Sequence, residues 1–569
     1  MFTKFDRVKY PTIASGIERY DDLTEKCILT DELKEAVCLF TSILVRPEPY
    51  TNAVEQALSD ALHFPLLSKI CEKGKPKKVV CDTVWSVGDR VYRCLDCQVD
   101  TGSALCARCF EMDKHRGHRV MTQSSGGGCC DCGDESAWAP EGFCSRHAAA
   151  YKERQNMTEE TLIGYIPPES RVQIQGLCLA VLLFTAKQTT DVVDEEGYNG
   201  EKVATSALKF LKTVLCDLGD GATRLCAKVV QMRARVLMEA AYPHSMIDEN
   251  PVLDLSLLDF IVSHDMELKP EARKALDAFY FYMITDNSFK CLFLIVVLRF
   301  YQFLNQNNLN YSPEANTDVG VLHLSVQLFS GKSLNLTHVD RVELAIHIME
   351  CMKSSLRLLP DGSYDPDCAF YTERRYLGLF CDIDYAMSRP QQTYRGTFFE
   401  RDDFMNALLD LVCYGTNSAL YTCVRTGDHV LYESKKWRYE ISFFLLFCSL
   451  SRTLCQDFDD SSISDECRIR ICRLIVERVF LFMKNDDEKL CKANNLNADD
   501  SLLFDTLTMP VEFSHLPQWI CMMFLKVALG HKIPLESLIP ESVDISSFAY
   551  LLTLWPARLK AVCGQEEAR

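Results

Sequence analysis

Apolar residues recur at helical intervals through most of the chain. Between residues 52 and 73 they repeat every three or four positions, beginning with Ala53, Ala57, Leu58, Ala61 and Leu62. This spacing places side chains on one face of an α-helix. Asn52 and Glu55 have the spacing of a capping box at its start. The pattern predicts a helical stretch that ends near Lys73.

Beyond about residue 160 the pattern is almost wholly helical, as in the run Ile469, Cys472, Ile475, Val479 and Phe482. Polar or Pro/Gly-bearing segments interrupt it near residues 187–201, 305–318, 360–367, 456–465 and 492–501. No fixed-period repeat is present. We therefore expect helices that stack as an irregular solenoid and present a long surface to partners.

The longest apolar run, residues 291–304, is broken by Arg299 and Gln302. No run reaches the roughly 20 residues that cross a bilayer, and residues 1–14 lack the apolar core of a secretory signal. The run predicts a buried helix, and we expect no membrane insertion.

One segment departs from the helical pattern because metal-ligand residues crowd into it. It contains nine of the 28 cysteines and has the spacing C-x2-C-x8-C-x2-C-x5-H-x2-H from Cys94 to His118. Pairs two residues apart let a tight turn present two donors to one Zn2+ ion. The ligands of this core are Cys94, Cys97, Cys106, Cys109, His115 and His118, and those flanking it are Cys81, Cys130, Cys132, Cys144 and His147.

These eleven ligands leave the metal count open, because three separate tetrahedral zinc sites need twelve. Three arrangements are compatible with this number. One thiolate could bridge two ions, Cys129 could be the twelfth ligand, or there could be only two zinc sites, with some cysteines not used as ligands. A site with four protein ligands is closed, so we expect the zinc ions to hold the fold rather than to perform chemistry.

Composition and net charge limit the class of protein and the kinds of partner that are compatible with this sequence. With 48% hydrophobic and 25% charged residues, the chain has the composition of a soluble globular protein. Its net charge of -18 argues against nucleic acid as a partner, because Lys and Arg dominate phosphate binding. A cationic partner fits better. The predicted fold is mainly α, with a small irregular multi-zinc domain and an extended helical-bundle or solenoid-like body, divided as 1–77, 78–150, 151–310 and 311–569.

The cysteine-rich segment resembles the UBR box, the zinc domain with which N-recognin E3 ubiquitin ligases bind protein N-termini. The resemblance rests on Cys81, the C-x2-C pairs, the H-x2-H pair, GGGCCDCGD at 126–134, Trp138 and CSRH at 144–147. It implies one zinc on Cys94, Cys97, His115 and His118. It implies a second on Cys81, Cys106, Cys109 and Cys130, and a third on the shared Cys109 with Cys132, Cys144 and His147.

The same resemblance implies an acidic pocket for a free amino group and a basic first side chain. Its residues would be Asp100, Asp131 and Asp134, with Cys129 beside them. The chain departs from the family pattern at Asp82, Gly102 and Cys129, and these departures bear on which N-terminal residues the pocket accepts. A carboxylate can accept two donors of an Arg fork, and metal ligands on both sides of Asp131 fix its position.

The rest of the chain resembles the central part of these ligases more weakly, for instance at LHLSVQLFS, 322–330. It resembles the subtype without a ClpS-like domain. After residue 150 the sequence contains no C-x2-C pair, so we expect no RING there. Either a RING lies on a further segment, which would bring an E2 ubiquitin-conjugating enzyme as partner, or the chain binds substrate without conjugating ubiquitin.

Two functions follow from these features. The first is substrate recognition in the N-degron pathway, binding proteins with Arg, Lys or His N-termini as part of a ligase in the cytoplasm, and in the nucleus as well. The alternative is a non-catalytic helical scaffold whose zinc domain docks other proteins, since part of the ligand run also resembles ZZ and B-box fingers.

Overall fold

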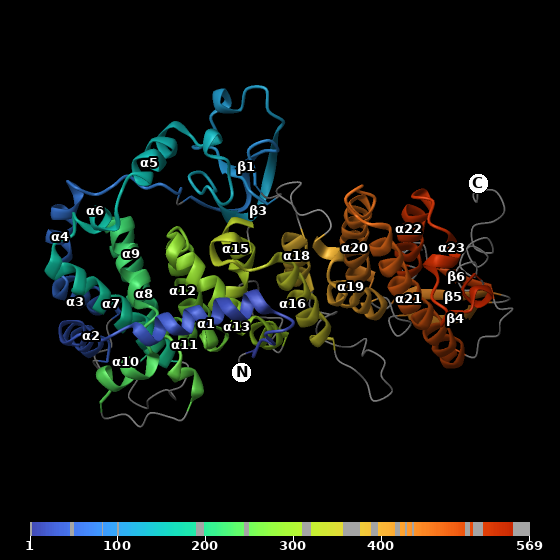
Figure 1. Ribbon diagram of the computed structural model, residues 1–569. Coiled ribbons are helices and arrows are strands. Elements are labelled where there is room, and N and C mark those ends of the chain that lie inside the picture. Colours follow the sequence, from blue (N-terminus) through green and yellow to red (C-terminus); the bar gives the residue numbers. More distant parts are fainter. Residues whose placement is uncertain are drawn as a thin grey trace. The chain divides into compact units, whose positions relative to one another are not determined.

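The computed structural model describes the chain except for residues 1–2, 46–50, 82, 100–101, 189–198, 244–249, 310–319, 330, 357–375, 388–396, 416–420, 427–428, 435–436, 495–500, 505–515 and 550–569. The described residues form two compact units, Met1–Asp340 and Arg341–Arg569. Both are mainly helical (Figure 1), as the apolar pattern predicts. The finer division into four parts stays a prediction.

The first unit begins with four helices: α1 (Pro11–Lys26), α2 (Asp31–Leu44), α3 (Thr51–Ala61) and α4 (Phe64–Glu72). The stretch that the sequence predicts as helical over 52–73 is two helices rather than one. The chain turns at His63, whose φ of 49° lies in the left-handed region, and Pro65 follows in the first turn of α4. Proline is tolerated there because its missing N–H has no partner in a first turn.

After the zinc domain come α5 (Ser145–Gln155), α6 (Glu159–Ile163), α7 (Pro168–Lys187), α8 (Gly200–Leu218), α9 (Asp220–Val229), α10 (Ala234–Ala241), α11 (Leu257–Ser263), α12 (Pro270–Met283) and α13 (Asn287–Leu309). The short helices η5 (Gly320–Leu324), α14 (Ser325–Leu328) and α15 (Gly331–Thr337) end the unit. Helix α7 is buried over its whole second half and packs on α2, α8, α9 and α11. A helix apolar all round belongs in a core.

Helix α13 contains the longest apolar run. Residues 287–306 are long and apolar enough to cross a membrane by length and composition, but two thirds of that window, 67%, is buried inside the protein. The helix packs on α1, α9, α11 and α15. Its Arg299 is also buried and pairs with Asp259 at 2.9 Å, so the charge that interrupts the apolar run is compensated within the unit. This confirms the predicted buried helix.

The zinc domain is built on a three-stranded antiparallel sheet of order β2-β1-β3. Its strands are β1 (Val84–Cys94), β2 (Leu105–Cys106) and β3 (Val120–Cys129). Strands β1 and β3 pair from Val84 opposite Cys129 to Cys94 opposite Val120, with a register shift between Val87 and Arg90. The sheet therefore carries metal-ligand residues at its ends.

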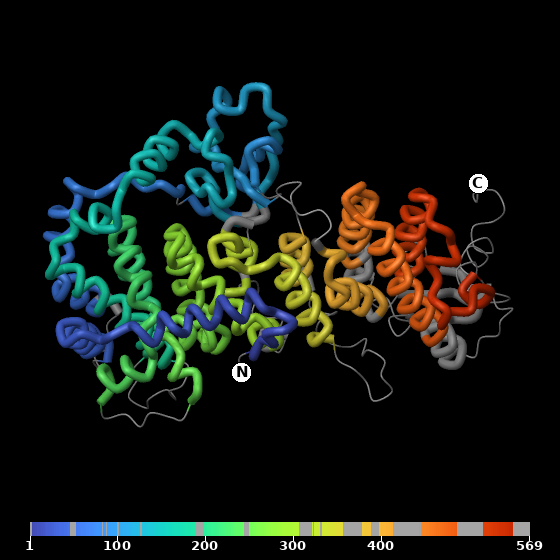
Figure 2. The backbone as a smooth tube through the Cα atoms, in the orientation of Figure 1, coloured from blue at the N-terminus to red at the C-terminus, as the bar shows by residue number. Residues whose placement is uncertain are grey.

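The helices before and after the zinc domain belong to one body. Helix α2 packs on α7, and α3 and α4 pack on α8. In Figure 2 the blue tube of the first helices runs among the green helices, while the zinc domain projects from them. The zinc domain is thus inserted into a helical unit whose two parts contact each other directly.

The second unit contains α16 (Arg341–Ser354), α18 (Tyr376–Met387), α19 (Asp402–Gly415), α20 (Trp437–Phe458), α21 (Asp465–Asn494), α22 (Leu516–Gly530) and α23 (Leu535–Leu538). Most of these helices pack on helices one or two places away in the chain, as in α16 with α18 and α19, α18 with α20, and α19 with α21, and α19 also packs on α22. Packing mainly between near neighbours is typical of a solenoid.

A small second sheet was not predicted. It has the order β4-β5-β6, with β4 (Tyr421–Thr426) and β5 (His429–Ser434) antiparallel and β6 (Ser501–Phe504) parallel to β5. Strand β6 comes after α20 and α21 in the chain, so no local sequence pattern predicts its pairing with β5.

Candidate metal centre and acidic pocket

Tight turns set the ligand pairs of the zinc domain. After β1 ends, the N–H of Cys97 donates to the carbonyl of Cys94 at 3.2 Å. The turn after β2 repeats this arrangement, with Cys109 donating to Cys106 at 3.0 Å. Each C-x2-C pair therefore points both sulfurs to one side of a single turn.

The first cluster joins one such turn to two histidines. Cys97 Sγ lies 3.5 Å from His115 Nδ1 and 3.2 Å from His118 Nδ1, and Cys94 Sγ lies 3.4 Å from His118 Nδ1. The cysteines and His115 are buried, while His118 is exposed. Four donors from the end of β1, its turn, the short helix η1 (Met112–His115) and the segment before β3 thus meet at one point.

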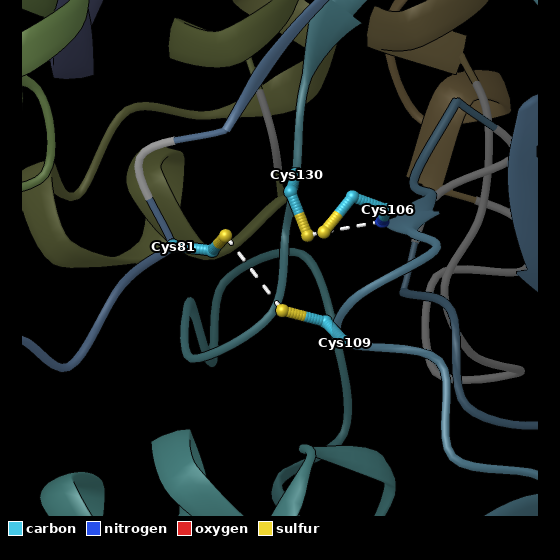
Figure 3. Close-up of side chains that lie close together, drawn as sticks. All are labelled: Cys81, Cys106, Cys109 and Cys130. Atoms are coloured by element: carbon cyan, nitrogen blue, oxygen red, sulfur yellow. Dashed lines mark hydrogen bonds between the residues drawn. The ribbon is translucent and has the colours of Figure 1, made fainter. Parts of the chain in front are cut away.

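Two further clusters share a residue. The ligand atoms within each lie no more than 4.8 Å apart, and the members are Cys81, Cys106, Cys109 and Cys130 in one, and Cys109, Cys132, Cys144 and His147 in the other. Figure 3 shows the four thiols of the first of these directed toward a common centre. The Cys109 and Cys81 sulfurs are 3.7 Å apart, and Cys109 Sγ is 3.5 Å from His147 Nδ1.

These separations fit tetrahedral zinc. With Zn–S near 2.3 Å and Zn–N near 2.0 Å, the edges of the tetrahedron are about 3.7 Å between sulfurs and about 3.5 Å between sulfur and nitrogen. The Cys81–Cys109 and Cys109–His147 distances match these edges. The residues thus fit three zinc ions, two of them joined by Cys109, as the resemblance implies.

Hydrogen-bond donors that are not themselves metal-binding atoms orient the ligand sulfurs. The N–H of Cys106 donates to Cys130 Sγ at 3.2 Å, and Arg146 Nη2 lies 3.8 Å from Cys109 Sγ. Donors of this kind fix a thiolate and offset its charge. The need would be greatest at Cys109, which would bridge two ions among five other thiolates. All four positions of each cluster would be filled by protein atoms, so zinc held there would have a structural role.

Cys129 is not part of any cluster among the described residues. It is partly buried at the end of β3, and burial together with the neighbouring Asp131 carboxylate raises the pKa of its thiol. Because Cys109 belongs to two clusters and Cys129 to none, the geometry favours the shared thiolate over Cys129 as the answer to the ligand count.

The loop that follows β3 holds Asp131 rigidly. Its Oδ2 accepts the N–H of Ala104 at 2.7 Å, and its own N–H donates to the carbonyl of Ala104 at 3.0 Å. Asp131 is buried, with 7% of its surface exposed, between the ligands Cys130 and Cys132. Gly133 then passes so close to Val79 that a Cβ would lie 1.8 Å from the Val79 carbonyl oxygen.

Asp134 lies on the same loop and is already paired. Its Oδ1 accepts the N–H of Ser136 at 2.8 Å, and its Oδ2 lies 3.3 Å from Nζ of Lys290 in α13. Burial alone would raise the pKa of Asp134, but Lys290 and the Ser136 hydrogen bonds together hold that pKa below its ordinary value. The carboxylate is therefore ionised and neutralised locally by a lysine. Asp100, the third predicted acid, lies outside the described residues.

A cavity of about 190 Å³ lies where this loop faces the helices of the same unit. We call it the acidic pocket. Its walls combine both parts of the unit and include Val80, Val84, Asp131, Asp134, Lys212, Ala278, Phe281, Tyr282 and Lys290. The aspartates therefore line a space with one apolar wall from α12 and two lysines.

Sequence reasoning did not anticipate the helical wall. Lys290 is 156 residues from Asp134 and lies immediately before the apolar run 291–304, where nothing in the local pattern marks it as part of a site. Lys290 is nevertheless unusual, because it is buried in a helix that is 67% buried over residues 287–306, and an ammonium group in a core needs a partner.

Comparisons with known proteins agree with the geometry. Residues 80–147 match the family model of the putative zinc finger in N-recognin, the UBR box. The E3 ubiquitin-protein ligase PRT6 of Arabidopsis thaliana is 28% identical over 235 residues, 41% of this chain and 11% of the relative. The ligase UBR1 of Homo sapiens is 38% identical over 397 residues, 55% of this chain and 22% of the relative.

UBR2 of Mus musculus, also an E3 ubiquitin-protein ligase, is 44% identical over 94 residues, 16% of this chain and 5% of the relative. The chain thus spans under a quarter of the length of each of these three relatives. It contains a UBR box and is homologous, over part of its length, to E3 ubiquitin-protein ligases.

Proposed function

We propose that this UBR-box protein recognises the N-termini of other proteins for the N-degron branch of ubiquitin-dependent degradation, and that it binds basic N-termini, Arg, Lys or His. The observation that carries the proposal is the position of Asp131, held between two zinc ligands at the wall of the acidic pocket. The likeness to E3 ubiquitin-protein ligases supports the pathway.

The chemistry of the pocket suits a protonated chain end. A free N-terminus carries a positive charge that a buried carboxylate binds through charge-assisted hydrogen bonds, each contributing about 1.5 to 3 kcal/mol. A fixed Asp131 side chain loses little freedom on binding, so less of that energy is spent on ordering the site. Acetylation of the N-terminus removes the charge and two donors.

Two features bear on which first residue fits. The apolar wall from Phe281 and Tyr282 can cover the methylene stem of an Arg or Lys side chain. Gly102, where the family often has a hydroxyl, offers no side-chain hydrogen bond to the first residue. We therefore propose that the carboxylates supply most of the selectivity for basic residues.

A binding experiment tests the proposal. Fluorescence anisotropy of the zinc-loaded full chain would compare an Arg-initiated peptide with its acetylated form and with a Gly-initiated one. We expect the Arg peptide to bind at least tenfold more tightly than either control, the factor that one charge-assisted bond supplies. Equal affinity for all three peptides would contradict N-terminus recognition.

Conjugation is a separate proposal. The sequence after residue 150 has no paired metal-binding cysteines of the RING kind, so we propose that an E2 enzyme is recruited through a RING on another segment or chain. Incubation of this chain with E1, E2 and ubiquitin should yield no ubiquitin chains. We also propose the cytoplasm and the nucleus as its location.

The second candidate function is a helical scaffold. It is favoured by the packing of α16 to α22 mainly on near neighbours in the chain, the kind of packing that gives repeat proteins their extended binding surfaces. In that case the zinc domain docks a folded partner, and peptide affinity does not depend on a free N-terminus. The anisotropy experiment separates the two functions.

A further inference from the structure

Lys290 lies at a position where a positively charged side chain is energetically unfavourable. Its side chain is buried with 3% exposed, and it lies in the first turn of α13, close to the positive end of that helix's dipole. Both burial and the helix dipole disfavour a positive charge there. The residue therefore needs a compensating anion.

That anion comes from the acidic pocket. Lys290 Nζ donates to Asp134 Oδ2 at 3.3 Å and to Ser136 Oγ at 3.1 Å. Among the described residues Asp134 is its one carboxylate partner within 4.0 Å. The nearest other acid on the helix start, Asp286, is bonded to the N–H of Phe289 and to Arg224 instead.

The contact reproduces the chemistry of the proposed ligand. The basic side chain of a Lys-initiated substrate is also an ammonium on a four-carbon stem, and Asp134 is one of the two described carboxylates of the pocket. Because Lys290 belongs to the same folded unit, it meets Asp134 at a high effective concentration and needs no diffusion to reach it.

We infer that Lys290 is an internal competitor that occupies the acidic pocket through Asp134 and sets the affinity for basic N-terminal residues. The inference rests on the proposed function. A basic side chain must displace the Lys290 ammonium from Asp134, so the apparent dissociation constant is raised by the inverse of the fraction of time for which Asp134 is open. A Gly-initiated peptide has no side chain that binds Asp134, so its affinity does not depend on displacing Lys290.

The test compares three full-length, zinc-loaded proteins: wild type, Lys290→Met and Lys274→Met. Methionine keeps the length of the stem and removes the charge. Lys274 is exposed on the neighbouring helix α12 and is not among the described residues that line the acidic pocket, so it controls for the change in net charge. Zinc content, expected at three per chain, confirms that each variant has folded.

We expect Lys290→Met to bind the Arg-initiated peptide about tenfold more tightly than wild type, the factor for a site that is open about a tenth of the time. Its affinity for the Gly-initiated peptide should be unchanged, and Lys274→Met should match wild type with both peptides. If Lys290 has only a structural role, Lys290→Met should bind the Arg-initiated peptide as wild type does or more weakly. This result would overturn the inference. The proposed function would still stand if the wild type binds the Arg-initiated peptide more tightly than its acetylated form.

A second measurement needs no variant, because loss of Lys290 leaves Asp134 uncompensated and can unfold the loop. Amine-reactive labelling followed by mass spectrometry reports the accessibility of each lysine in the wild type. Saturating Arg-initiated peptide should increase labelling of Lys290 several-fold and leave that of Lys274 unchanged. Unchanged labelling at saturation overturns the inference. If neither wild type nor Lys290→Met distinguishes free from acetylated N-termini, the proposed function itself fails and the inference fails with it.

Discussion

The sulfur of Cys109 lies 3.5 Å from Nδ1 of His147, although Cys109 also closes the four-sulfur cluster that begins at Cys81. One thiolate therefore serves two metal positions. We predict that Cys109→Ala lowers the zinc content from three ions per chain to one, because both clusters lose a ligand at once and metal binding is coupled to folding. Elemental analysis of the purified protein measures this directly.

Cys129→Ala is the matched control for that change. Cys129 precedes the ligand Cys130 but belongs to none of the three clusters, so the variant should keep all three ions. Two ions remaining in Cys109→Ala would show that Cys109 serves one cluster alone.

Asp131 should matter for binding but not for metal. We predict that Asp131→Asn weakens binding of an Arg-initiated peptide by about 10- to 100-fold, since the charge is lost while an oxygen remains to accept the Ala104 N–H. Asp113→Asn, which neutralises an exposed carboxylate paired only with Arg116 on the surface, should bind as wild type does. Peptide affinity and zinc content are both measured, and a loss of zinc in Asp131→Asn would reassign the residue to folding.

Two glycines of the zinc domain form a natural pair for a stability test. Gly133 and Gly117 both have positive φ, at 92° and 88°, but a Cβ at Gly133 would meet the Val79 carbonyl at 1.8 Å while one at Gly117 meets nothing within 4 Å. We predict that Gly117→Ala costs about 1 kcal/mol, from backbone strain alone. Gly133→Ala should cost several kcal/mol more, because backbone atoms must move.

Zinc-release rates with a chelator measure this difference. Release should be much faster for Gly133→Ala than for Gly117→Ala, and equal rates would contradict the close approach of Val79 to the loop.

Asp265 predicts a pH dependence of stability. Burial raises the pKa of its carboxyl to about 6, against the opposing effects of the Val321 N–H and Arg273. The folded-state pKa lies above the unfolded value of 3.8, so the stabilising effect of protonation is complete below that value and is lost as pH rises through 6. The free energy of unfolding should therefore rise by about 1 kcal/mol as the pH is lowered from about 7.5 to about 5.5.

Asp265→Asn, which is permanently neutral, removes this contribution. Denaturant unfolding of both proteins at each pH gives the difference between them, which isolates Asp265 from other titrating groups. A difference that stays constant over this range would show that Asp265 has an ordinary pKa.

The metal centre could be predicted from sequence because its ligands are set by local turns. Cys94 with Cys97 and Cys106 with Cys109 lie on turns of four residues, and the family pattern assigned the remaining partners. The pairing of Asp134 with Lys290 could not be predicted, because it depends on how the loop packs against α13, which begins at Asn287, 153 residues later in the chain. The sheet of β4, β5 and β6 was missed for the same reason: β6 reaches its partner across two long helices.

Helices α2, α3 and α4 precede the zinc domain and yet pack on α7 and α8, which follow it. These helix contacts do not pass through the zinc domain, and a tethered loop costs only a logarithmic increase in closure entropy. Loss of zinc would accordingly disorder the zinc domain and its pocket before it disturbed the packing of α2–α4 on α7 and α8. The proposed binding of N-termini would then depend more steeply on zinc than the fold of the helical unit does.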